Sequence, residues 1–263
     1  MHLEATAVRH EENDTMSTTN TTNPTTNARN TATATARTNA HSNARSNEGE
    51  AINAGAPSNA NACTDRRGVS PRIAILTNDL QYELVDKNPE RHANVDRFKP
   101  GLIQFLNNMR ALDHRVAHLQ LVYDEGDKKI ELHDGRIPVL RGTPGAEIIR
   151  EFMHPSDAII EKKKDSGFFE TELDAYLKRH DIQIVIITGM QAQICVQTTA
   201  ADAHFRGYNV IVPSDGVVST RDEDRDRALE WLRSYCAVVM PMNDIVTTLR
   251  AHRTFDFSVP ALP

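Results

Sequence analysis

The stretch Ile184-Val-Ile-Ile-Thr-Gly-Met-Gln-Ala-Gln-Ile-Cys195 indicates the fold class of this chain. It begins with a continuous aliphatic run, which is typical of a strand covered on both faces rather than of a strand with one face in water. Its second half leads into an amphipathic segment, 195–206, and Gly207 stands where a helix commonly ends. A buried strand that runs into a helix is the repeating unit of α/β domains.

Five more aliphatic runs of this kind occur along the chain, separated by amphipathic stretches. Pro100 and Pro144 stand where the first turn of a helix favours proline. The regular alternation predicts a doubly wound, mainly parallel six-stranded sheet with helices on both faces. The expected strands are 73–77, 116–122, 158–160, 184–188, 210–212 and 237–240, and the expected helices are 100–111, 144–152, 172–180, 195–206, 222–235 and 243–252.

The first 70 residues differ in composition from the rest of the chain. Residues 17–51 contain no Leu, Ile, Val, Met or aromatic residue, and Thr and Asn fill more than half of positions 17–48. Such a segment cannot bury enough apolar surface to offset the entropy lost on ordering. We therefore expect a disordered Asn/Thr-rich tail at 1–70, one α/β domain at 71–254 and a short C-terminal tail at 255–263.

Charge, hydropathy and cysteine usage narrow the classes of function. The net charge is −6, and no basic stretch is interleaved with aromatic residues, which argues against nucleic acid as a partner. The chain has neither an apolar run of about 18 residues that would span a membrane nor the apolar core of a secretory signal. Cys63, Cys195 and Cys236 are too widely spaced for a disulfide framework or a zinc site, so a reducing cytoplasm is the default location. An organellar transit peptide in the acid-free segment 15–47, or a start at Met16, remains an alternative.

Reactive side chains follow three of the predicted strands. Asp79 comes after the first strand, Lys162 after the third, and Cys195 opens the helix after the fourth. Ligands bind beyond the carboxyl ends of such strands. A helix N-terminus and an ammonium both favour a thiolate, and a carboxylate can accept the thiol proton. Each residue also has an ordinary interpretation: a turn-capping Asp, a solvated lysine run and a buried helical Cys. The residues alone therefore leave a thiol site and an ordinary sheet edge both open.

Three motifs, in order, resemble those of the isochorismatase-like cysteine hydrolases. The segment Ile187-Thr-Gly-Met-Gln-Ala-Gln-Ile-Cys-Val-Gln-Thr-Thr-Ala-Ala-Asp-Ala203 is similar to that family's nucleophile segment, in which a strand, a glycine and a variable loop precede Cys-Val and an alanine-rich helix. Asp79-Leu-Gln81 resembles the family's Asp-Met-Gln. Lys162-Lys-Lys-Asp-Ser-Gly-Phe168 resembles its Lys-x-x-x-Ser-Ala/Gly-Phe, which selects the first of the three lysines. The resemblance covers about 72–250.

The resemblance implies a catalytic triad of Asp79, Lys162 and Cys195. Asp79 would take the thiol proton, Lys162 would hold the carboxylate and favour the thiolate, and Cys195 would attack a carbonyl to form an acyl-enzyme. It also implies an oxyanion hole made by the backbone N–H groups of Gln191 and Cys195, after a cis peptide bond between Met190 and Gln191. The residues expected to line the substrate pocket are Gln81, Tyr82 and Phe168, with core packing as the alternative for Phe168.

Departures from the family pattern narrow the expected substrate. Nicotinamidases of the superfamily carry an Asp-x-His metal motif after the second strand, where this chain has Tyr123-Asp-Glu-Gly-Asp-Lys-Lys129 and no histidine before His133. We therefore expect no metal and no other cofactor. The expected function is a metal-independent cysteine amidohydrolase that cleaves a small amide, carbamoyl or ureido compound.

Two alternatives to this function remain. An isochorismatase-type enzyme would hydrolyse a vinyl ether with the Asp as its acid, without the thiol. A catalytically idle family member would use its N-terminal tail to bind partners. For the enzyme we expect a small-molecule substrate, no nucleic-acid or membrane partner, and a homo-oligomer.

Overall fold

The computed structural model describes residues 71–127 and 137–258. The predicted tail at 1–70 lies outside the described residues, as does the end of the predicted C-terminal tail. Of that C-terminal segment, Phe255 is buried in one of the two core clusters, and Phe257 packs beside it with ring centroids 6.1 Å apart.

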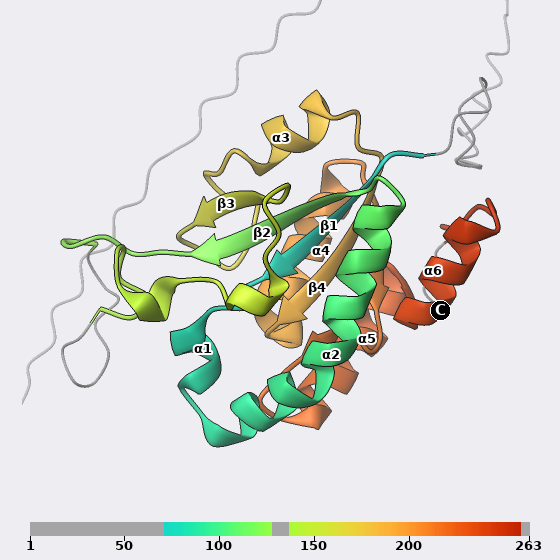
Figure 1. Cartoon of the computed structure of the whole chain (residues 1–263). Helices are drawn as coiled ribbons and strands as arrows, with labels where there is room; N and C mark the ends of the chain where they lie inside the picture. The colour runs from blue at the N-terminus through green and yellow to red at the C-terminus, as the bar shows by residue number, and fades with distance from the viewer. Residues whose placement is uncertain (1–70, 128–136, 259–263) are drawn as a thin grey trace, which may run out of the picture. The chain divides into compact units, whose positions relative to one another are not determined.

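A parallel sheet forms the centre of the domain (Figure 1). Six strands lie in the order β3-β2-β1-β4-β5-β7, and every neighbouring pair is parallel, which confirms the prediction of a doubly wound sheet. A further two-residue strand, β6, pairs with the end of β4. The strands are β1 (Ile73–Asn78), β2 (Arg115–Leu121), β3 (Ala158–Lys162), β4 (Ile184–Met190), β5 (Asn209–Pro213), β6 (Val217–Val218) and β7 (Val238–Met240).

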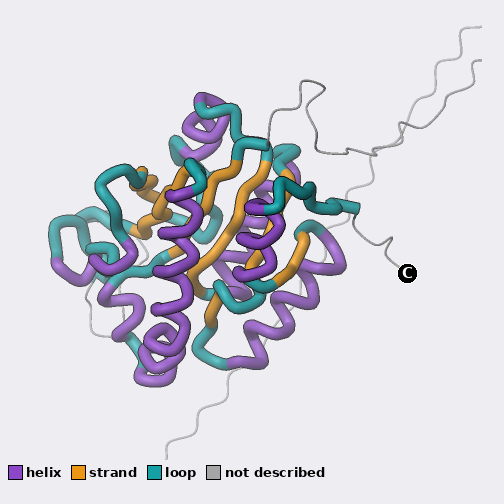
Figure 2. The backbone as a smooth tube through the Cα atoms, turned by 45° about the vertical axis from the view of Figure 1, so that its right-hand side comes forward, coloured by secondary structure: helices purple, strands orange, loops and turns teal. Residues whose placement is uncertain are grey.

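Helices cover both faces of this sheet, as the tube in Figure 2 shows. On one face α2 (Pro89–Ala111) and α6 (Met242–Arg250) bury their apolar side chains against β1 and β4, together with the short α1 (Tyr82–Asp86). On the other face α3 (Leu173–Arg179), α4 (Gln197–Phe205) and α5 (Asp222–Tyr235) enclose a second core cluster. Strands β1 and β4 alternate side chains into both clusters, which accounts for their uninterrupted aliphatic sequence.

The predicted helix start at Pro100 was wrong. Helix α2 begins at Pro89, eleven residues earlier, and Pro100 lies inside it. The Asn88 side chain caps the helix by accepting hydrogen bonds from the backbone N–H groups of Glu90 and Arg91, and Pro89 occupies the first turn. Pro100 lies on the exposed side of the helix, where water can bond the carbonyl left without a donor.

The predicted helix over 144–152 was also wrong. The segment forms two separate 3-10 turns, η1 (Pro144–Ala146) and η2 (Arg150–Phe152). Between them the backbone pairs with the chain after β1: the Tyr82 N–H donates to the Glu147 carbonyl, and the Ile149 N–H donates to the Leu80 carbonyl. This extended pairing consumes the groups that a continuous helix would need.

Deleting residues 1–68 should leave the domain intact, because their sequence offers almost no apolar side chains that could dock on it. We expect the melting temperature and the turnover of the shortened chain to match those of the full chain. Thermal unfolding of both forms tests this. A fall of about 5 °C, which for a domain of this size corresponds to more than about 1 kcal/mol, would contradict it.

Candidate active site

Asp79, Lys162 and Cys195 meet at the carboxyl edge of the sheet. Asp79 follows β1 with φ +56°, Lys162 is the last residue of β3, and Cys195 lies in the π-helical turn η3 (Ala192–Val196) that joins β4 to α4. Strand β2 lies between β1 and β3, so the Lys162 side chain spans the end of β2 to reach Asp79. Its Nζ lies 3.0 Å from each carboxylate oxygen. All three residues are buried.

Lys162 is held as a buried ammonium. Besides Asp79, its Nζ donates to the carbonyl oxygens of Lys164 and Asp165, at 3.2 and 3.3 Å. Burial alone would lower the pKa of Lys162, but the neighbouring Asp79 and Cys195 outweigh it, and the net shift is upward. The adjacent Lys163 instead lies on the surface. Of the three consecutive lysines, the structure therefore brings the first into the site.

The surroundings of Cys195 oppose ionisation of its thiol. Burial, with the negative charge of Asp79, raises the pKa of the thiol, and the opposing effect of Lys162 is smaller. These effects act against the thiolate that a helix terminus and an ammonium would favour. Burial also raises the pKa of Asp79, against the effect of Lys162. A carboxylate with a raised pKa is a better proton acceptor, which suits it to deprotonate the thiol on demand.

The loop between β4 and the cysteine has a fixed conformation. The Met190–Gln191 peptide bond is cis, as the resemblance implies. The Gln191 side chain forms a pair of hydrogen bonds with Thr220: Nε2 donates to Oγ1 at 3.0 Å, and Oε1 accepts from the backbone N–H at 2.9 Å. Ser219 donates to the Gln193 side chain at 2.6 Å. The backbone of residues 190–195 is thereby tied to the segment after β6, and the Gln191 side chain points to that segment.

Gly189 brings the ends of β1 and β4 into close contact. It pairs with Asn78 in the sheet register and has φ +102°. A Cβ at this position would lie 2.4 Å from the Asn78 carbonyl oxygen, so a side chain here would separate the two strands that carry Asp79 and Cys195. Thr199 of α4 strengthens the same junction, because its hydroxyl contacts the Asn78 side chain at 3.3 Å.

The three predicted pocket residues have other contacts. Gln81 is fully buried, and its amide makes hydrogen bonds with the Leu121 carbonyl and N–H and with the Ala146 carbonyl. Tyr82 is 37% exposed, and its hydroxyl accepts from the Arg150 N–H. Phe168 is buried in the core, stacked on Tyr208 with centroids 5.9 Å apart. These side chains support the loops around the triad.

Two residues beside the triad are absent from the set predicted from the sequence. Tyr123 follows β2 and is half-buried; burial raises the pKa of its hydroxyl, and the charges of Lys162, Asp165 and Asp79 act on it. Asp165 accepts a hydrogen bond from the Cys195 thiol, with Sγ 3.7 Å from Oδ1. Tyr123 could have been found by applying the strand-end rule to the second strand as well. The strand-end rule does not single out Asp165, since it lies three residues beyond the end of β3, in the loop after the three lysines.

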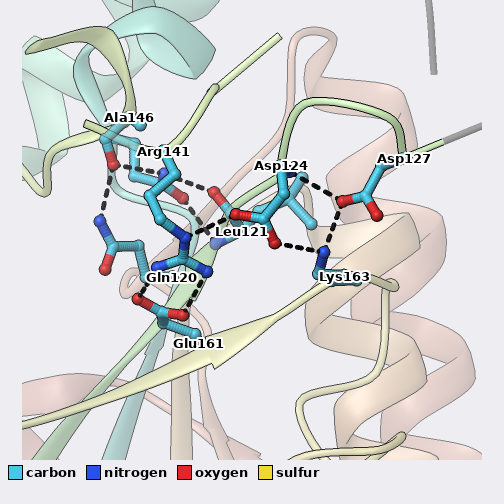
Figure 3. Close-up of polar contacts among 9 residues, drawn as sticks. Gln120, Leu121, Asp124, Asp127, Arg141, Ala146, Glu161 and Lys163 are labelled. Carbon is cyan, nitrogen blue, oxygen red and sulfur yellow. Dashed lines mark hydrogen bonds and ion pairs between the residues drawn. The ribbon is translucent and has the colours of Figure 1, made fainter. Parts of the chain in front are cut away.

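Exposed ion pairs join the ends of β2 and β3 (Figure 3). Arg141 makes two hydrogen bonds with Glu161, at 2.6 and 2.8 Å, and one with Asp124 at 2.6 Å. Lys163 lies between Asp124 and Asp127. The bonds from Arg141 and Lys163 lower the pKa of Asp124 to about 2. Basic side chains already engage these carboxylates, so they do not fit a metal.

Residues 73–244 match the model of the isochorismatase domain. The chain belongs to the isochorismatase family. Within 71–127 and 137–258, no three His, Cys, Asp or Glu side chains of this family member are grouped to hold a metal ion. No helix in those ranges is long and apolar enough to cross a bilayer.

Individual relatives differ in what they are described as doing. A secreted isochorismatase effector of Verticillium dahliae is 27% identical over 57% of this chain and 77% of its own. A probable inactive nicotinamidase of Arabidopsis thaliana is 34% identical over 57% of this chain and 82% of its own. The crystal structure of N-carbamoylsarcosine amidase from Thermoplasma acidophilum superposes with a TM-score of 0.56 and 29% identity, covering 65% of this chain and 97% of that one. This chain is an isochorismatase-family hydrolase by sequence and by fold.

Proposed function

We propose that this isochorismatase-family hydrolase is a metal-independent cysteine amidohydrolase that cleaves a small amide, carbamoyl or ureido compound. The observation that carries the proposal is a buried Asp79–Lys162 pair at the sheet edge of Cys195, whose charges act on the thiol. A vinyl-ether hydrolase needs the acid, with water as the nucleophile, whereas acyl transfer to the enzyme needs a nucleophilic side chain as well. The similarity to an N-carbamoylsarcosine amidase supports the same class of substrate.

In the proposed mechanism, Asp79 takes the proton from Cys195 while Sγ attacks the carbonyl carbon. The N–H groups of Gln191 and Cys195 stabilise the oxyanion that forms. The C–N bond then breaks, and the amine leaves with the proton that Asp79 returns. Water, deprotonated by Asp79, attacks the acyl-enzyme, which releases the acid and restores the thiol. Lys162 stays protonated throughout and holds the carboxylate in place.

A panel of small amides, carbamoyl and ureido compounds, assayed for ammonia release, tests the proposal. Turnover of at least one compound is the expected result. Pyruvate release from isochorismate, without turnover of any amide, would favour the vinyl-ether alternative. A chain that turns over neither an amide nor isochorismate would match the alternative of a catalytically idle family member. The similarity to a probable inactive nicotinamidase is a reason to test for this outcome.

Chelation should leave the activity unchanged. The proposed mechanism uses a thiol, a carboxylate and backbone N–H groups, and the carboxylates after β2 are engaged by Arg141 and Lys163. We expect equal amide turnover before and after dialysis against EDTA. Loss of turnover on dialysis, with recovery on adding zinc or iron, would show that a metal takes part.

We also propose a cytoplasmic homo-oligomer whose partner is its small-molecule substrate. Cysteine usage supports the cytoplasmic location. Cell fractionation tests it. Recovery of the protein from the culture medium would contradict the proposal, and the similarity to a secreted relative is a reason to look for it there. Light scattering coupled to size-exclusion chromatography tests the oligomeric state, with a mass of 29.4 kDa as the monomer value that would contradict it.

A further inference from the structure

Asp165 lies beside the thiol of Cys195. It is exposed to solvent, whereas Cys195, 3.7 Å away, is 7% exposed. The backbone of Asp165 is held from two sides: its carbonyl accepts from the Lys162 ammonium at 3.3 Å and from the Thr199 hydroxyl at 3.5 Å. These bonds anchor the backbone of Asp165 next to the nucleophile, where its carboxylate contacts the thiol.

Asp165 also brings a negative charge to the site. Within the described ranges it forms no ion pair with a basic side chain, while Arg141 and Lys163 are each paired with other carboxylates. Asp79 and Lys162 form an ion pair, and burial raises the pKa of the Cys195 thiol. The Asp165 charge raises the pKa of both Asp79 and Cys195, so its field reaches the reacting groups.

We propose that Asp165 determines substrate specificity: it favours substrates with a cationic or N–H-rich group next to the scissile carbonyl and disfavours those with a carboxylate there. The reason is geometric. When Sγ attacks a carbonyl carbon, a substituent on that carbon lies within a few bond lengths of the sulfur and therefore near the Asp165 carboxylate. This inference rests on the proposed amidohydrolase function and names its substrate class. Since isochorismate carries carboxylates, the same charge counts against the vinyl-ether alternative.

Charged thiol reagents test the field at Cys195 without any substrate. The full chain is treated with a cationic aminoethyl and an anionic sulfonatoethyl methanethiosulfonate, and peptide mass spectrometry follows modification of Cys195 alone. The ratio of the two rates within one variant does not depend on the thiolate fraction, because that fraction is common to both. Since Asp165 is exposed and screened by solvent, we expect Asp165→Asn to lower the cation-to-anion ratio by about 10-fold rather than by orders of magnitude.

Asp181→Asn is the matched control. Asp181 is exposed, precedes β4 at the opposite edge of the sheet, and has φ +53°, a conformation that Asn tolerates. The Asp181→Asn variant loses the same charge far from the thiol, so its cation-to-anion ratio should equal that of the original chain. An unchanged ratio in Asp165→Asn, or an equal fall in both variants, would overturn the proposal.

Three amides that differ in the charge of one end group extend the test to turnover: 3-aminopropanamide, butanamide and succinamate. We expect kcat/KM to decrease in that order, and Asp165→Asn to bring the three values together. Equal loss of kcat on all three in Asp165→Asn would overturn the specificity role in favour of a role in proton transfer. If the chain with the original sequence hydrolyses no amide, the proposed function fails. The cation-to-anion ratio of the reagent rates still decides whether Asp165 selects for charge.

Discussion

Cys195→Ala should lower amide turnover by about four orders of magnitude or more, because a nucleophile that acts as a unit with its base takes most of the rate with it when removed. Ammonia release measures the loss. Thermal stability should change little, since alanine suits a helical turn and the thiol's hydrogen bond goes to an exposed carboxylate. Asp79→Asn should be nearly as inactive, because the thiol then loses the buried carboxylate that we propose as its base.

Cys236→Ala is the control for this result. Cys236 is also buried, at the end of α5 and within the core cluster that α3, α4 and α5 enclose. Its loss should cost on the order of 1 kcal/mol through a small cavity and leave turnover intact. Full activity in Cys195→Ala together with an inactive Asp79→Asn would contradict the thiol mechanism, because the acid would then act without the sulfur, as the vinyl-ether alternative requires of its own reaction.

Lys162→Met should destabilise the fold as well as abolish turnover. The change leaves the Asp79 carboxylate buried without its counter-ion, and removing one partner of a buried pair costs about 3–5 kcal/mol. Loss of the Lys162 charge raises the folded-state pKa of Asp79 above its already raised value, so the carboxyl group can lessen this cost by binding a proton. Its unfolded pKa stays near the ordinary value of about 3.9. The loss of stability should therefore be small at acid pH and grow as pH rises through the folded-state pKa.

Urea unfolding at several pH values checks this dependence. The double variant Asp79→Asn/Lys162→Met removes both charges, and asparagine suits the positive φ of position 79. It should regain most of the stability of the original chain at neutral pH while staying inactive. A single variant whose stability deficit did not change with pH, or a double variant no more stable than the single one, would mean that the buried charge of Asp79 is not what Lys162 offsets.

Most of the sheet could be predicted from the sequence. The strands β1 and β4 contact both core clusters, so their residues must be apolar on both faces, and this requirement produces the continuous aliphatic runs by which the strands are recognised. The meeting of Asp79, Lys162 and Cys195 was predictable for a related reason. Parallel strands bring their carboxyl ends to one edge, and the resemblance identified which polar residues at those ends matter.

Other features depend on contacts that the sequence does not encode locally. The capping of α2 by Asn88 places the helix start before a proline that by itself looks like a start. The extended pairing of 147–149 with the chain after β1 replaces the helix that its apolar spacing favours. The position of Asp165 beside the thiol depends on how the backbone of Lys164 and Asp165 folds around the Lys162 ammonium. No sequence pattern in this loop predicts that conformation.

The distribution of the triad over three strands has a consequence during synthesis of the chain. Asp79 and Lys162 are 83 positions apart, and the cysteine is made last. While β4 is still inside the ribosome, the nascent chain contains Asp79 and Lys162 but has no nucleophile beside them. The sulfur gains its proton acceptor only when β4 pairs with β1. The same applies to a mature molecule that has opened locally at that junction, so the chemistry of the thiol is confined to copies in which β4 is paired with β1.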